Sequence, residues 1–81
     1  MLILSNIEKQ DDIIKADYFY PRQTLDIGYV EYDKVEHRFS KIIFNKEDSL
    51  NGRKSILKTS HIFETMVEKD DYPTWYRCLG I

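Results

Sequence analysis

The chain has few of the residues that crosslink or interrupt a fold. Its 81 residues include one cysteine, three glycines and two prolines, and no apolar run exceeds four residues. The single cysteine, Cys78, excludes an internal disulfide and with it a disulfide-dense secreted scaffold. The short apolar runs exclude a membrane-spanning helix. Since Met1 is followed by neither a basic stretch nor a long apolar segment, we expect no signal peptide and a cytoplasmic protein.

The charge balance is close to even. Twelve Lys and Arg stand against fourteen Asp and Glu, which gives a net charge of −2. This excludes a polybasic nucleic-acid binder and a strongly acidic chain. An apolar share of 42% fits one ordinary globular domain, which we place at residues 1–81. A chain this short buries only about 60% of its unfolded surface, so we expect no deep substrate pocket.

Alternating apolar and polar residues predict strands in three places along the first half of the chain. A fourth strand is expected near the end, and residues 1–4 are either a short strand or a frayed end. The expected strands cover residues 13–20, 27–32, 38–45 and 74–80. Residues 10–12 and 33–37 are expected to be turns. Ser5 and Glu8 have capping-box spacing, and the competing interpretation is a helix from there through Ala16.

Helical spacing begins at Ile56, with Ser55 as N-cap, after a loop over residues 46–54. The Asp70-Asp71-Tyr72-Pro73 segment ends this helix. The expected order is strand, strand, strand, helix, strand. This predicts an α+β fold, an antiparallel meander of three to four strands with one helix on one face. The last strand either returns beside an outer strand or pairs with another chain.

The third strand, over residues 38–45, carries apolar residues on both faces. Phe39, Lys41 and Ile43 alternate with Ser40, Ile42 and Phe44. Two explanations remain open, a central position in the sheet and a dimer contact through the second face.

Four short motifs carry a resemblance. They are Tyr-Phe-Tyr-Pro at 18–21, Gly-Tyr-Val-Glu-Tyr-Asp at 28–33, Ser-His at 60–61 and Pro-Thr-Trp-Tyr at 73–76. Together they resemble small, uncharacterised cytosolic proteins of Gram-positive bacteria and their mobile elements. The resemblance implies a β-hairpin, a helix carrying the Ser-His pair and a closing strand, and it implies no catalytic residue.

Aromatic residues exceed what one small core face needs. Eleven of the 81 residues are Phe, Trp or Tyr, and Tyr, Trp and Arg dominate the energetic centres of protein interfaces. We therefore expect a small module that binds another protein or its own copy without catalysis. The expected anchors are Tyr29, Tyr32, Trp75, Tyr76 and Arg77. The competing interpretation is that these rings close the core through cross-strand pairs.

The first alternative is single-stranded nucleic-acid binding. Arg53, Lys54 and Lys58 cluster where the helix is expected to begin, and sheet tyrosines could stack bases beside them. A sequence pI of about 5.6 weighs against this alternative, because nucleic-acid domains carry a basic surface.

The second alternative is a minor metal-dependent enzyme. His61 and Glu64 lie three residues apart on the expected helix, and His37 in the second turn could add a ligand. No other close-spaced ligand pair accompanies them, so we expect no metal and no cofactor. Cys78 is expected to be a buried thiol rather than a nucleophile. The carboxylate pairs at 11–12, 47–48 and 70–71 are expected to be solvated turn charges.

Overall fold

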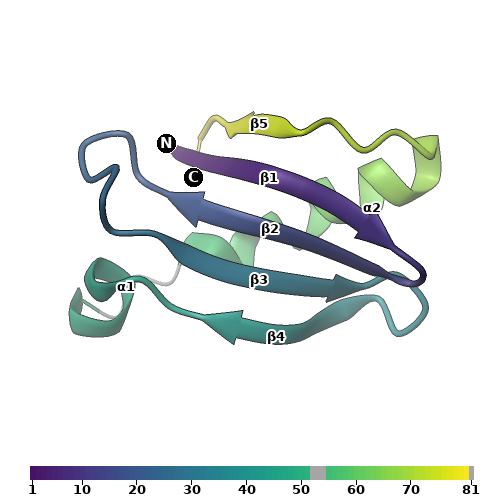
Figure 1. The fold of residues 1–81 in the computed structure, drawn as a ribbon, viewed down its shortest axis with the longest axis horizontal. Coiled ribbons are helices and arrows are strands. Elements are labelled where there is room, and N and C mark those ends of the chain that lie inside the picture. The colour runs from purple at the N-terminus through teal and green to yellow at the C-terminus, as the bar shows by residue number, and fades with distance from the viewer. Residues whose placement is uncertain (52–54, 81) are drawn as a thin grey trace.

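A five-stranded antiparallel sheet dominates the computed structural model, which describes residues 1–51 and 55–80 (Figure 1). The strands follow the order β4-β3-β2-β1-β5 across the sheet. They are β1 Leu2–Gln10, β2 Ile13–Phe19, β3 Gly28–Asp33, β4 Arg38–Ile43 and β5 Trp75–Cys78. The helices are α1 Lys46–Asn51, the 3₁₀-helix η1 Ser55–Thr59 and α2 Ser60–Lys69. The α+β class is confirmed, but the sheet has five strands and the meander begins one strand earlier than expected.

The strand that the sequence pattern left open, as a short strand at residues 1–4 or a frayed end, is β1. It is nine residues long and pairs with both β2 and β5, so the alternative of a capped helix from Ser5 is wrong. A β-bulge interrupts its alternation: Asn6 has a positive φ of 50°, and the register shifts between Ser5 and Glu8. Because of this extra residue, Leu4 and Ile7 both face the core although three positions separate them.

A second bulge shapes β4, which is an edge strand rather than a central one. Glu31 pairs with Lys41 but Tyr32 pairs with Phe39, so Ser40 is the extra residue. This places Phe39 and Ile42 on the covered side of the sheet, where both pack against the core, and leaves Ile43 on the other side. Of the two explanations for apolar residues on both faces of this strand, the central position is excluded.

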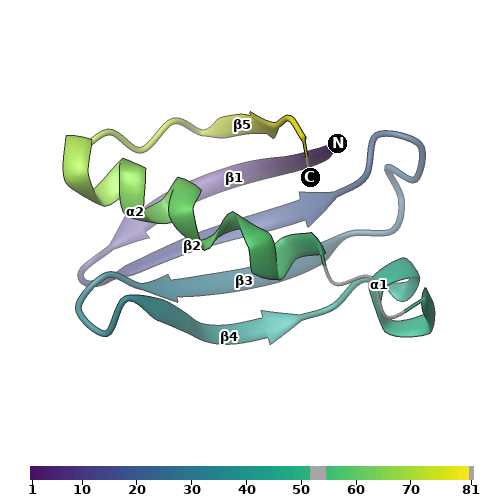
Figure 2. The ribbon, with the colours of Figure 1, turned by 180° about the vertical axis from the view of Figure 1, so that it is seen from behind.

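The helices cover a single face of the sheet. Figure 2 shows η1 and α2 running obliquely across the strands, and Figure 1 shows the opposite face without them. Phe63 of α2 stacks on Tyr32 at 5.2 Å between ring centroids, and Phe39 meets both rings edge-on. The α2 helix ends at Asp70, whose left-handed conformation lets its N–H reach the last turn. The expected stop at residues 70–73 is therefore confirmed, and the helix itself starts later, at Ser60.

The segment expected to be a loop contains the short helix α1. The Asp26 carboxylate accepts hydrogen bonds from the backbone N–H groups of Lys46 and Glu47, at 2.8 and 3.0 Å. The Asn45 side chain accepts another from the N–H of Asp48 at 2.9 Å. These caps satisfy the N-terminal donors of a helix too short to be stable alone.

The Asp48 carboxylate is fully buried, so its assignment as a solvated turn charge is wrong. The Tyr18 and Tyr20 hydroxyls donate to it at 2.8 and 2.5 Å. Tyr18 also accepts a hydrogen bond from the N–H of Asn45. Burial, and next the hydrogen bond to Asp48, raises the pKa of Tyr20 to about 12. The two hydroxyls therefore stay protonated and hold α1 against the end of β2.

The last strand, β5, returns beside β1 within the same chain, from Leu2 opposite Cys78 to Ser5 opposite Trp75. Of the two alternatives for this strand, the intramolecular one is confirmed. None of the helices in residues 1–51 and 55–80 is long and apolar enough to cross a membrane.

Candidate functional site

The candidate site is the sheet face that η1 and α2 leave uncovered, which we call the open face (Figure 1). Strand register assigns its residues, because cross-strand partners share a face. All five strands contribute. The side chains are Ile3, Ser5, Glu8, Gln10, Ile13, Lys15, Asp17, Phe19, Tyr29, Glu31, Asp33, Arg38, Lys41, Ile43, Trp75 and Arg77.

One line of cross-strand partners on this face has large side chains at both ends and two short side chains between them. We call it the aromatic row, and it runs from β4 to β5 as Ile43, Tyr29, Asp17, Ser5 and Trp75. Ile43 is 52% exposed and Trp75 is 49% exposed. Their apolar surface therefore faces solvent at two positions, with the short side chains of Asp17 and Ser5 between Tyr29 and Trp75.

The β5 end of the open face is the most apolar part of it. The Arg77 guanidinium lies 5.6 Å from the centre of the Trp75 ring, within cation–π range. Ile3 pairs with Phe19 on one side and Arg77 on the other. Ile3 is 4% exposed although none of the described helices covers this face, so its neighbours on the sheet exclude water from it.

A second line of partners, the charged row, alternates in sign across four adjacent strands. It consists of Lys41, Glu31, Lys15 and Glu8, from β4 to β1. Within the described residues, none of these four joins an ion pair. The Tyr29 hydroxyl donates to Glu31 at 2.6 Å, and burial followed by this bond raises the pKa of Tyr29 to about 12. Lys15 donates to the Gln10 side chain at 2.8 Å, and Lys41 Nζ lies 6.0 Å from the centre of the Tyr29 ring. The row therefore presents four charges, three of them with neutral partners within the chain and none with a charged one among the described residues.

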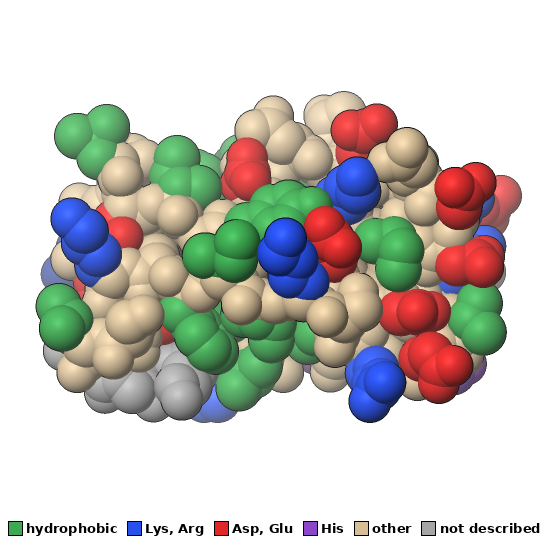
Figure 3. All heavy atoms as spheres, turned by 60° about the horizontal axis from the view of Figure 1, so that its bottom comes forward, with side chains coloured by type: hydrophobic (Ala, Val, Ile, Leu, Met, Phe, Trp, Pro, Cys, Tyr) green, Lys and Arg blue, Asp and Glu red, His purple; other side chains and the backbone are tan. Residues whose placement is uncertain are grey.

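Figure 3 views the molecule from the β4 side. Hydrophobic side chains gather in the middle of this view, directly beside basic and acidic ones. Asp and Glu side chains gather toward its right end, where the β1–β2 and β3–β4 turns lie (Figures 1 and 3). This surface therefore has apolar and charged groups side by side (Figure 3).

The structure separates the five expected anchors. Tyr29, Trp75 and Arg77 share the open face. Tyr76 lies on the helix side of β5 and is 39% exposed. Tyr32 is removed from the set, because it is 1% exposed and stacks on Phe63 in the core. The alternation of residues 27–32 places Tyr29 and Tyr32 on opposite faces of the strand, as the structure has them. The local sequence does not indicate which of these two faces a helix covers.

The sheet tyrosines of the nucleic-acid alternative do not share one exposed surface. Arg53 and Lys54 lie outside the described residues, and Lys58 is exposed on η1. Tyr18 and Tyr32 are buried under the helices, while Tyr29 lies on the opposite face. Stacking successive bases requires rings on one exposed surface, and this arrangement does not supply it.

The metal alternative brings two of its three residues together. His37 Nδ1 lies 2.9 Å from Glu64 Oε1, and the Tyr32 hydroxyl donates to the same oxygen. His61 is not part of this contact, and no group of three His, Cys, Asp or Glu side chains able to hold a metal occurs among the described residues. The hydrogen bond from Tyr32, helped by His37, lowers the pKa of Glu64. This arrangement ties the β3–β4 turn to α2.

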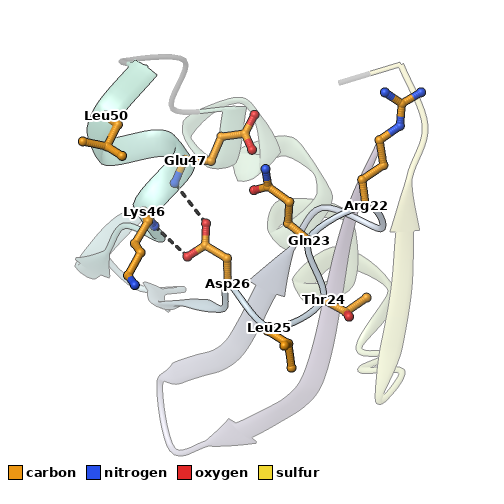
Figure 4. A pocket seen from close by; sticks show the side chains of 8 residues that line it. All are labelled: Arg22, Gln23, Thr24, Leu25, Asp26, Lys46, Glu47 and Leu50. Atoms are coloured by element: carbon orange, nitrogen blue, oxygen red, sulfur yellow. Dashed lines mark hydrogen bonds between the residues drawn. The ribbon is translucent and has the colours of Figure 1, made fainter.

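A hollow of about 560 Å³ lies between the β2–β3 connection and α1 (Figure 4). Its lining is Arg22, Gln23, Thr24, Leu25, Asp26, Lys46, Glu47 and Leu50. The Asp26 carboxylate, the most central acid in Figure 4, already accepts two backbone hydrogen bonds from α1. No His, Cys or Ser is present among these eight residues, and the central acid, Asp26, is already used to cap α1.

Cys78 lies in the core, and burial raises the pKa of its thiol to about 11. Because the thiolate is the reactive form, we expect Ellman's reagent at pH 8 to modify the native protein roughly a hundredfold more slowly than the urea-unfolded chain. Time-resolved absorbance measures both rates. Equal rates would show that Cys78 is accessible and ionised, and would restore it as a candidate nucleophile.

The fold and the site define a small antiparallel α+β domain with one sheet face covered by helices and one left open. No protein-family model, curated protein or solved structure matches the chain.

Proposed function

We propose that this protein is a small cytoplasmic, non-catalytic module that works by binding protein through its open face. The observation that carries the proposal is the aromatic row, with Ile43 and Trp75 about half exposed on a sheet face that no described helix covers. The core on the opposite face is complete without these side chains. Their exposure therefore contributes nothing to folding that a polar residue would not also provide.

The chemistry of the open face also supports binding. Its Trp, Arg and Tyr residues are the types that dominate interface energetics. Trp75 and Arg77 already stack on each other, so part of the entropy cost of ordering them is met before a partner arrives. Among the described residues, neither the hollow beside α1 nor the His37–Glu64 contact forms a catalytic site as clearly defined as the open face.

The test is photocrosslinking in the cells that produce the protein. A benzophenone amino acid replaces Ile43 on the open face in one variant and Leu57 on η1 in the other. The two positions are matched, because Leu57 is 45% exposed and lies on the helix side. We expect protein crosslinks from position 43 that are at least about fivefold more abundant than those from position 57.

A third variant combines the crosslinker at position 43 with Trp75→Ala. We expect the crosslinks to fall several-fold, because the ring supplies apolar contact area to the partner. Position 43 yielding no protein crosslink, or yielding no more than position 57, would overturn the proposal.

A further inference from the structure

We infer that the occupant of the open face is a second copy of this chain, related by a two-fold axis that runs parallel to the strands between β2 and β3. This inference rests on the proposed function, because it names the partner of the same face. Two sheets that pack face to face keep their strands roughly aligned. A symmetric pair must also match each side chain with its own counterpart across the axis.

The charged row selects the position of this axis. The axis between β2 and β3 exchanges β3 with β2 and β4 with β1. It places Lys41 opposite Glu8 of the copy and Glu31 opposite Lys15 of the copy. All four charges then meet an opposite charge, and each contact occurs twice in the dimer.

Two of the competing axes bring like charges together. An axis along β2 places Lys15 opposite its own counterpart and Glu31 opposite Glu8. An axis perpendicular to the strands through the charged row places Lys41 opposite Lys41. Like charges held face to face oppose association. An axis between β1 and β2, or between β3 and β4, pairs only two of the four charges with an opposite charge. The axis between β2 and β3 is therefore the favourable choice, because it pairs all four.

The aromatic row fits the same axis by size. It places Tyr29 over Asp17 of the copy and Ile43 over Ser5 of the copy, so each large side chain meets a small one. Trp75 pairs with Ser5 within its own chain and therefore stands beside the Ile43 of the copy. The half-exposed apolar surfaces of Ile43 and Trp75 are then covered together. Charge and shape, which depend on different residues, thus indicate one arrangement.

The experiment uses charge reversal at Lys41 and Glu8. These residues lie three strands apart in one chain and meet only in the dimer. Sedimentation velocity on the full-length protein is expected to show a dimer for the wild type. K41E and E8K are each expected to weaken dimerisation by about tenfold or more, because each creates two like-charge contacts across the axis.

Complementation makes the test specific. In an equimolar mixture of K41E and E8K, both contacts become Glu opposite Lys, so a heterodimer is expected to form with wild-type affinity. The E8K/K41E double variant is expected to form homodimers again. K58E on η1 and E68K on α2 are matched reversals of exposed charges on the other side, and they are expected to leave the dimer unchanged.

Three outcomes of the sedimentation experiments would overturn the inference. If the wild type stays monomeric up to about millimolar concentration, or if K41E and E8K dimerise as the wild type does, the open face does not pair with itself through this axis. Failure of the mixture to recover the dimer excludes the facing of Lys41 and Glu8. In any of these cases, crosslinks from position 43 to a different protein would leave the proposed function standing.

Discussion

Replacing Gly28 by alanine is expected to lower the free energy of unfolding by roughly 3 kcal/mol. A Cβ atom at this position would lie 2.1 Å from Cε1 of Tyr18 and 2.8 Å from the carbonyl oxygen of Ile43. The Tyr18 ring must then move, and its hydroxyl would leave Asp48 and the N–H of Asn45. Urea denaturation followed by Trp75 fluorescence measures the loss.

Two controls separate this steric effect from the intrinsic properties of glycine. In a Tyr18→Leu background, G28A is expected to cost about half as much, because the crowded ring is gone. Gly80 has a positive φ of 80° and open space around it, so G80A is expected to cost about 1 kcal/mol through backbone conformation alone. Equal costs for G28A in both backgrounds would contradict the ring contact as the cause.

Replacing Asp48 by alanine is the second change with a large expected effect, again roughly 3 kcal/mol. The buried hydroxyl of Tyr18 and the partly buried hydroxyl of Tyr20 would lose their shared acceptor, and α1 would lose its attachment to β2. A buried polar group left without a partner costs more than its hydrogen bond contributes. The loss is measured as a shift in the urea midpoint at constant slope.

The matched variants for Asp48 differ in how many donors remain unsatisfied. D48N keeps one acceptor oxygen and is expected to cost about half as much as D48A. Removing the hydroxyls as well, in Y18F/Y20F/D48A, is expected to cost less than the sum of the separate changes, because no buried donor is then left unpaired. Strict additivity would indicate that the three side chains do not act as one unit.

Part of the candidate site was accessible from sequence. Alternation in residues 27–32 placed Tyr29 on the face opposite Val30 and Tyr32, and the structure has the same alternation. The alternation of residues 74–80 places Trp75 and Arg77 on one face of the last strand, and the structure has them on one face. The charged row was not found, because its four members come from four strands and become neighbours only through the sheet order β4-β3-β2-β1.

The sequence did not predict the full length of β1 or the burial of Asp48, because a bulge causes the first and distant residues cause the second. The positive φ of Asn6 shifts the alternation of β1, so a strand of nine residues carries no clear period of two. Asp48 has the local sequence of a turn carboxylate. It is buried because Tyr18 and Tyr20, about thirty residues earlier, point their hydroxyls at it.

Local pattern was sufficient for the α+β class, the two hairpin turns, the buried sides of β2 and β3, and the near-neutral charge. Each of these depends on residues a few positions apart, so the periodicity of the local sequence predicts it directly. Long-range pairing was needed for the partner of β5, the edge position of β4 and the choice of which aromatic face the helices cover. Those features depend on which strands lie side by side, and the free energy of that choice comes from contacts between residues far apart in the chain.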